Sequence, residues 1–275
     1  MMKFHRYFKK GNSVIGMIHV DGLPGAPKYN GNTLDIVKNA MKDAEIYLES
    51  GVDAVLVENM HDVPYIRSKD LMPETTAMMT RICTEIRKTL PNCMPCGVQV
   101  LAGCNKEALA VAQAANFQFI RAEGFVFSHI ADEGFIDGSA GNLLRYRKKI
   151  GADDILIFTD LKKKHSSHAI TSDISLTETA KAAEFFLSDG IVITGFATGC
   201  PANKKDLKDV RQASNLPVLI GSGITIDNVQ SYLTADAFII GSHFKIDGKW
   251  ENPIQMQSIK DFMQKLKHLQ SVNLQ

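Results

Sequence analysis

Short apolar runs alternate with stretches of helical periodicity eight times along this chain of 275 residues, and this alternation restricts the fold more than any other feature. Continuous runs rich in valine and isoleucine are typical of parallel strands that are covered on both faces. Because such strands are joined by right-handed crossovers, eight of them close into a barrel. We expect strands at 14–20, 53–57, 97–101, 117–121, 154–158, 190–193, 217–220 and 237–240.

Helical stretches fill the gaps between these strands. We expect them at 33–50, 73–90, 105–115 and 176–188, with a short helix that ends near residue 150 after a glycine-rich loop at 123–141. The length fits as well, since a (β/α)₈ barrel needs about 250 residues. We therefore predict an α/β fold, a single (β/α)₈ TIM barrel domain over residues 1–275, in which 1–13 form an N-terminal lead-in and 253–270 a closing helix.

Composition excludes several classes of partner. A net charge of +1 gives no reason to expect binding to nucleic acid. No apolar run approaches the roughly 20 residues that a membrane span needs. The first ten residues are basic but lack the apolar centre of a signal peptide, so we expect a cytoplasmic protein. A very short mitochondrial presequence is the alternative, because no acidic residue precedes Asp21.

The five cysteines indicate reduced thiols, because their number is odd and no secretory signal accompanies them. Cys93 and Cys96 have the spacing of a metal knuckle, but no second cysteine or histidine pair stands beside them. We interpret them as core and loop thiols rather than as a zinc or redox site.

Glycine and serine follow the last two expected strands. Such turns let backbone N–H groups approach an anion closely, and a helix that follows each turn would point its positive end at the same place. In (β/α)₈ barrels the phosphate site often lies at these two turns. A tight turn without a ligand is the plainer alternative. We predict that phosphate is bound by Gly221, Ser222, Gly223, Gly241 and Ser242.

Polar residues at the carboxyl ends of the strands are the candidates for chemistry, because only they and the long loops after the first, second, fourth and fifth strands can meet at the barrel mouth. They are His19, Glu58, Asn59, Arg121, Glu123, Asp160, Lys164, His165, Thr194 and Thr198. A carboxylate, an imidazole and a lysine near a phosphate suffice for proton abstraction, glycosidic cleavage or aldol-type chemistry.

Each candidate has a structural alternative. His19 could be a satisfied histidine of the barrel interior, and the lysines at 162–164 could be a solvated charged run. Glu58 and Asp160 are harder to explain without a site, since a carboxylate that closes an apolar strand needs a partner or a ligand. A divalent cation held by these two carboxylates is a further hypothesis, although nothing in the spacing demands it.

The sequence resembles the BtpA (SgcQ-like) family over nearly its whole length. The matching segments include Ile-Gly-Met-Ile-His-Val at 15–20, Leu-Pro-Gly-Ala-Pro at 23–27, Lys-His at 164–165, and both glycine-serine turns with their flanks at 217–228 and 241–249. The resemblance implies a barrel of the ribulose-phosphate-binding type. It assigns no reaction, and the family takes its name from a member tied to photosystem I biogenesis.

Two segments at the mouth depart from the family pattern. Leu-Ala-Gly-Cys-Asn stands at 101–105 where the family has Leu-Arg-Asn-Asp, and Ala-Glu-Gly stands at 122–124 where the family has Val-Asn. The substrate or the chemistry is therefore expected to differ from that of bacterial relatives, and a photosystem role does not follow from the fold.

We expect an enzyme, a lyase, isomerase or hydrolase, that acts on a small phosphorylated metabolite such as a sugar phosphate or a nucleotide-like compound. Glu58 and Asp160 would serve as acid and base, Lys164 and His165 would stabilise negative charge, and His19 would orient the substrate. Asn59, Arg121, Glu123, Thr194 and Thr198 would bind it. The alternatives are a non-catalytic assembly factor and a metabolite sensor on the same barrel. No cofactor beyond the hypothetical cation is implied, and a homo-oligomer is compatible with the sequence.

Overall fold

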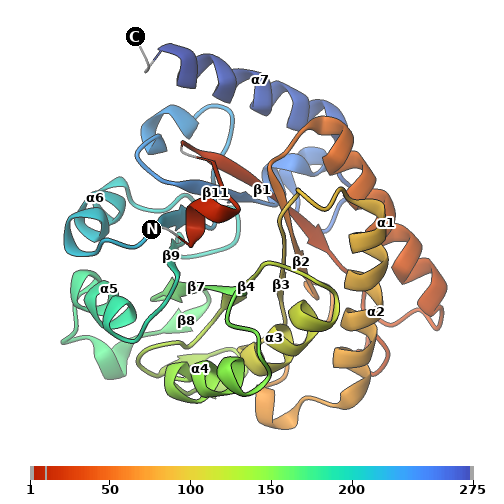
Figure 1. Cartoon of the computed structure of the whole chain (residues 1–275), viewed down its shortest axis with the longest axis horizontal. Helices are drawn as coiled ribbons and strands as arrows, with labels where there is room; N and C mark the ends of the chain where they lie inside the picture. Colours follow the sequence, from red (N-terminus) through yellow and green to blue (C-terminus); the bar gives the residue numbers. More distant parts are fainter. Residues whose placement is uncertain (1–2, 10, 273–275) are drawn as a thin grey trace.

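Eight parallel strands close into a barrel in this computed structural model, which describes residues 3–9 and 11–272 (Figure 1). The strands follow one another around the barrel in sequence order, and the last one pairs with the first. They are β1 (Ser13–His19), β2 (Ala54–Glu58), β3 (Cys96–Gln99), β4 (Phe119–Ala122), β7 (Leu156–Leu161), β9 (Gly190–Ile193), β10 (Val218–Ile220) and β11 (Ala237–Ile240). The predicted fold is confirmed.

Seven α-helices of the described chain surround the barrel: α1 (Thr33–Ser50), α2 (Pro73–Thr89), α3 (Asn105–Ala114), α4 (Ala140–Lys149), α5 (Leu176–Phe185), α6 (Lys204–Ala213) and α7 (Met256–Val272). Local sequence signals explain several of their ends. Asn32 caps α1 by accepting hydrogen bonds from two amides, and Gly51 ends the helix in the left-handed conformation. Ser175 forms a capping box with Glu178 at the start of α5.

The core has two layers. Between barrel and helices lies a large cluster of aliphatic side chains, whereas a smaller cluster rich in aromatic rings fills the barrel interior. The 3₁₀ helix η1 (Phe4–Arg6) closes the amino-terminal end of the barrel. There Phe4 stacks on Phe8 with ring centroids 4.6 Å apart, and both rings contact Phe158 of the barrel wall. The N-terminal lead-in is therefore part of the core.

Two connections differ from expectation. The glycine-rich segment expected as a loop at 123–141 contains a hairpin, β5 (His129–Ala131) and β6 (Gly134–Ile136), and β5 also pairs with the short strand β8 (Ser166–Ser167). These strands form a small separate antiparallel sheet. Its strands are too short for a two-residue periodicity to be read from the sequence.

The connections after β10 and β11 also differ. Among the described residues, no α-helix begins directly after either turn. The first leads to the 3₁₀ helix η4 (Val229–Tyr232) and the second to η5 (Ser242–Phe244). Three further short 3₁₀ turns lie at η2 (Ser68–Asp70), η3 (Ala169–Thr171) and η6 (Ile246–Gly248). A helix of three or four residues adds little dipole, so any anion there must be held by individual amides.

Candidate active site

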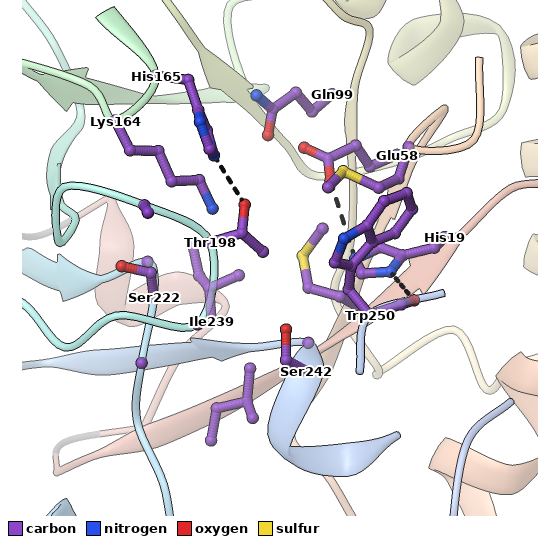
Figure 2. Close-up of a pocket in the computed structure, with 18 of the residues that line it drawn as sticks. His19, Glu58, Gln99, Lys164, His165, Thr198, Ser222, Ile239, Ser242 and Trp250 are labelled. Atoms are coloured by element: carbon purple, nitrogen blue, oxygen red, sulfur yellow. Dashed lines mark hydrogen bonds and ion pairs between the residues drawn. The ribbon is translucent and has the colours of Figure 1, made fainter. Parts of the chain in front are cut away.

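A cavity of about 520 Å³ opens at the carboxyl ends of the barrel strands, where the long loops meet. Figure 2 shows that its walls come from segments far apart in the chain, with Glu58 and His19 on one side and Lys164, Thr198 and Ser222 on the other. Most of the predicted residues line it: His19, Glu58, Arg121, Glu123, Lys164, His165, Thr198, Gly221, Ser222, Gly223, Gly241 and Ser242.

The glycine-serine turns lie side by side because their strands pair, with Ile220 opposite Phe238 in the register. Within the described chain, the backbone amides of Ser222, Gly223 and Ser242 donate no hydrogen bond to the protein. The hydroxyl of Ser222 is already engaged, since it accepts from the amide of Gly195 at 2.7 Å and donates to a backbone carbonyl at 2.9 Å. The turns therefore offer amides, not this hydroxyl, to a ligand.

Gly223 is required by the geometry of the turn. Its φ of +68° is left-handed, and an added Cβ would collide with the backbone at Cys200 and Pro201. A residue with a side chain would be strained here and would displace the neighbouring loop. This explains why a glycine follows Ser222 in the turn after β10.

Two buried ion pairs lie beside the cavity, and three of their four residues, Arg121, Glu123 and Lys163, line it. Asp160 and Arg121 face each other through two hydrogen bonds, Nε to Oδ2 at 2.9 Å and Nη2 to Oδ1 at 2.8 Å. Glu123 accepts from Lys163 Nζ at 3.1 Å. Burial raises the pKa of the Glu123 carboxyl, but Lys163, Arg121 and His129 together outweigh this effect and leave the pKa below its usual value. These four side chains neutralise one another.

Glu58 and Lys164 remain without a partner of opposite charge among the described residues, and both line the cavity. Glu58 is 6% exposed, and burial raises the pKa of its carboxyl despite the opposing charges of Arg121 and Lys164. Burial and the charge of Arg121 lower the pKa of the Lys164 ammonium. Both pKa values move toward pH 7, which is the shift that general acid–base catalysis requires.

His19 is a neutral imidazole in this environment. Burial, reinforced by the positive charge of Lys245, lowers its pKa to about 3. Its Nδ1 lies 3.2 Å from the carbonyl oxygen of Trp250, so Nδ1 carries the proton and donates it. Nε2 is then an acceptor, 3.9 Å from Glu58 Oε2, and this contact is no ion pair at neutral pH.

Three predicted residues do not line this cavity. Asp160 lies inside β7 rather than at its tip and is directed at Arg121. The side chain of Asn59 bridges the amide of Leu101 and the carboxylate of Asp62. Thr194 has a buried hydroxyl without a hydrogen-bond partner in the described part of the chain. Their proposed catalytic and binding roles remain predictions.

Several residues of the lining were not predicted: Met60, Tyr65, Gln99, Lys163 and Trp250. Gln99 had a signal, because a polar side chain in an otherwise apolar parallel strand requires a partner. Trp250 had none, since it lies in an irregular loop beyond the last strand. Its ring packs against His61, with centroids 5.0 Å apart.

The described residues were also compared with what a metal site and a membrane-spanning helix require. Within residues 3–9 and 11–272, no group of three or more His, Cys, Asp or Glu side chains is arranged to hold a metal ion. The carboxylate of Asp160, proposed as half of a cation site with Glu58, is occupied by Arg121. None of the helices in the described part combines the length and the apolar character needed to cross a bilayer.

Comparison with known proteins agrees with the sequence resemblance. A family model described as the BtpA family matches residues 10–268. The chain is 48% identical over 256 residues to an uncharacterized protein of Caenorhabditis elegans named as mitochondrial, with 91% of each chain covered. It is 31% identical over 265 residues to the photosystem I biogenesis protein BtpA of Synechocystis, covering 96% of this chain and 91% of that protein.

Solved structures share the fold at low sequence identity. Orotidine 5'-monophosphate decarboxylase from Methanocaldococcus jannaschii, complexed with the inhibitor BMP, superposes with a TM-score of 0.58 at 17% identity, covering 94% of this chain and 99% of that one. The architecture is a TIM barrel.

Proposed function

The chain belongs to the BtpA family, and on that premise we propose that it is an enzyme that acts on a small phosphorylated metabolite. One observation carries the proposal. Ser222, Gly223 and Ser242, whose backbone amides donate to no acceptor in the described chain, line the same open cavity as buried Glu58 and half-buried Lys164, which have no ion-pair partner there. Backbone amides suit a phosphate because they donate hydrogen bonds to its oxygens. Without such donors, burying the negative charge in a water-poor site would be unfavourable. The structural relative named above, which acts on a monophosphate by its name, supports the same substrate class.

The couple suits a reaction that moves a proton. Glu58 in its ionised form would take a proton from the substrate, and the Lys164 ammonium would stabilise the negative charge that develops. Phosphate held by the amides of Ser222, Gly223 and Ser242 would supply binding energy remote from the reacting atoms and so orient them. Isomerases and lyases share such a step, and hydrolysis is the third class that these groups allow.

The test removes a single amide of the cradle. Ser242 is the first residue of η5, and replacing it by proline removes its N–H, which has no partner within the helix. We expect Ser242→Pro to abolish the rise in melting temperature that inorganic phosphate and sugar phosphates produce, because ligand binding stabilises the folded state by mass action. Ser242→Ala keeps the amide and should respond as the wild type does.

A second arm tests the couple itself. Lys164→Gln and Glu58→Gln should retain phosphate binding but lose turnover of any substrate found by such a screen. Normal turnover in both variants would contradict the catalytic proposal. Binding without turnover in the wild type would favour the metabolite sensor instead.

An assembly factor remains the second candidate, because the Synechocystis relative is named for photosystem I biogenesis. One observation favours it: Phe185, Phe186 and Leu187 are 81%, 45% and 67% exposed at the end of α5. The open cavity argues against it, since a barrel used only as a scaffold has no need of an unfilled mouth. Retention of partner capture after replacement of all three residues by serine would remove this support.

The compartment and the oligomeric state also remain proposals. We infer a cytoplasmic location from the sequence, with the mitochondrion as the alternative that the name of the nematode relative supports. Microscopy of the tagged protein distinguishes the two. A homo-oligomer would appear in light scattering as a mass well above 30.3 kDa.

A further inference from the structure

Gln99 ends β3 inside the cavity, and its amide orientation is determined by its neighbours. Only 2% of the residue is exposed. Its Nε2 donates to Glu123 Oε1 at 3.2 Å, while Glu123 Oε2 accepts from Lys163 and from the amide of Gly103. An ionised carboxylate can only accept hydrogen bonds, so the nitrogen of the Gln99 amide must face Glu123. The oxygen must therefore face away from Glu123.

That oxygen has no donor. Gln99 Oε1 is buried without a hydrogen-bond partner among the described residues, and Figure 2 shows the amide directed into the cavity near Glu58. A second acceptor of the same lining, Glu133 Oε2, is also buried and unpaired. Buried acceptors are normally paired, and an exception calls for a missing donor. Two such exceptions in one cavity indicate that a ligand supplies donors there.

The barrel order separates these acceptors from the phosphate cradle. The strands follow one another as β1, β11, β10, β9, β7, β4, β3 and β2, so β3 lies directly across the barrel from β10. Within residues 3–9 and 11–272, the turn after β10 presents N–H donors without an acceptor, whereas the end of β3 presents an acceptor without a donor. A ligand that spans the cavity must then be an acceptor at one end and a donor at the other.

We propose that the substrate is a sugar or polyol phosphate, and that Gln99 is a specificity-determining residue that accepts a hydrogen bond from a hydroxyl remote from the phosphate. This inference rests on the proposed function, because it takes the amides of the glycine-serine turns as the phosphate site. An alkyl or other apolar phosphate would leave Gln99 Oε1 unpaired in the complex. A site built to bind a hydroxyl discriminates strongly against an analogue that lacks it.

The experiment compares three probes by the fluorescence of Trp250, the one tryptophan of the chain, which lines the cavity. Inorganic phosphate occupies only the cradle. Pentyl phosphate and ribitol 5-phosphate have the same number of carbons, but only the second carries hydroxyls along the chain. We expect the wild type to bind ribitol 5-phosphate at least about tenfold more tightly than pentyl phosphate, the factor that one hydrogen bond commonly provides.

Gln99→Met keeps the length of the side chain and removes the acceptor. It should lose most of this preference while binding pentyl phosphate and inorganic phosphate as the wild type does. Gln264→Met, on the exposed face of α7, is the matched control and should keep the preference.

The outcomes separate the two proposals. If the wild type binds inorganic phosphate and both esters equally, the role of Gln99 is refuted and the phosphate site survives. An unchanged preference in Gln99→Met refutes it as well. If no probe binds to the wild type, the proposed function fails and this inference fails with it. The comparison of esters in the wild type tests the inference even if Gln99→Met does not fold.

Discussion

Buried His19 should make the protein sensitive to mild acid, and replacing it should remove a defined part of that sensitivity. The side chain of His19 is 5% exposed, and its pKa falls from 6.5 to about 3 in the folded protein. In the unfolded chain the imidazole binds a proton near pH 6.5. Because the unfolded state binds more protons in this range, lowering the pH below 6.5 favours unfolding.

The size of the effect follows from the two values. At pH 5 the unfolded imidazole is almost fully protonated and the folded one is not, so His19 costs ~2 kcal/mol of unfolding free energy relative to pH 8, at 1.36 kcal/mol per pH unit. His19→Asn keeps a nitrogen that can donate to the carbonyl of Trp250 but does not titrate. The variant should therefore lose about 2 kcal/mol less stability than the wild type between pH 8 and pH 5.

Urea unfolding at both pH values, followed by circular dichroism, measures this difference. Comparing variant with wild type cancels the contributions of other buried histidines, such as His129, whose pKa burial lowers to about 4. The exposed His268→Asn is the matched control. Equal losses of stability in His19→Asn and in the wild type would refute the neutral, buried imidazole described here.

Three further substitutions give distinct outcomes. Glu58→Gln should raise the urea midpoint at pH 7, because the pKa of this carboxyl is raised in the folded state and its ionised form therefore opposes folding. The gain should vanish below about pH 4.5, where the carboxyl is protonated in both states. Asp160→Asn should lower the unfolding free energy by about 3–5 kcal/mol in the same assay, since the buried guanidinium of Arg121 loses its charged partner; a stable variant that lacks only activity would instead support a catalytic Asp160. Gly223→Ala should lower the melting temperature by the equivalent of at least about 1 kcal/mol and weaken phosphate binding, because its φ is +68° and its Cβ would collide with Cys200; unchanged values would mean that the turn adapts freely.

The barrel was predictable because its signal is repeated. Each strand is a short apolar run between helical stretches, so small errors at single strands do not change the topology. Boundaries were less accurate: β7 extends to Leu161, three residues beyond the expected end. That difference matters for the site, because it places Asp160 inside the strand beside Arg121 rather than at its tip.

The site was predictable only where a residue's position at the end of a strand determines that it lines the cavity. Gly221 to Gly223 follow directly after β10, Glu58 is the last residue of β2, and all of them line the cavity. Pairings across the barrel have no such signal. The sequence does not indicate that Lys163 pairs with Glu123 while its neighbour Lys164 has no carboxylate partner in the described part of the chain. This difference depends on the path of a loop that joins a small sheet. The orientation of Gln99 depends on the same pairing.

The phenylalanine rings that close the amino-terminal end of the barrel bear on whether the protein is processed for import into mitochondria. Phe4 and Phe8 are 1% and 2% exposed, and they seal the interior from below. A mitochondrial protease that removed residues 3–9 would open the amino-terminal end of the barrel and expose the ring of Phe158 to water. Phe4 and Phe8 therefore contribute to the packed core of the folded protein, which a cleavable targeting segment would not do.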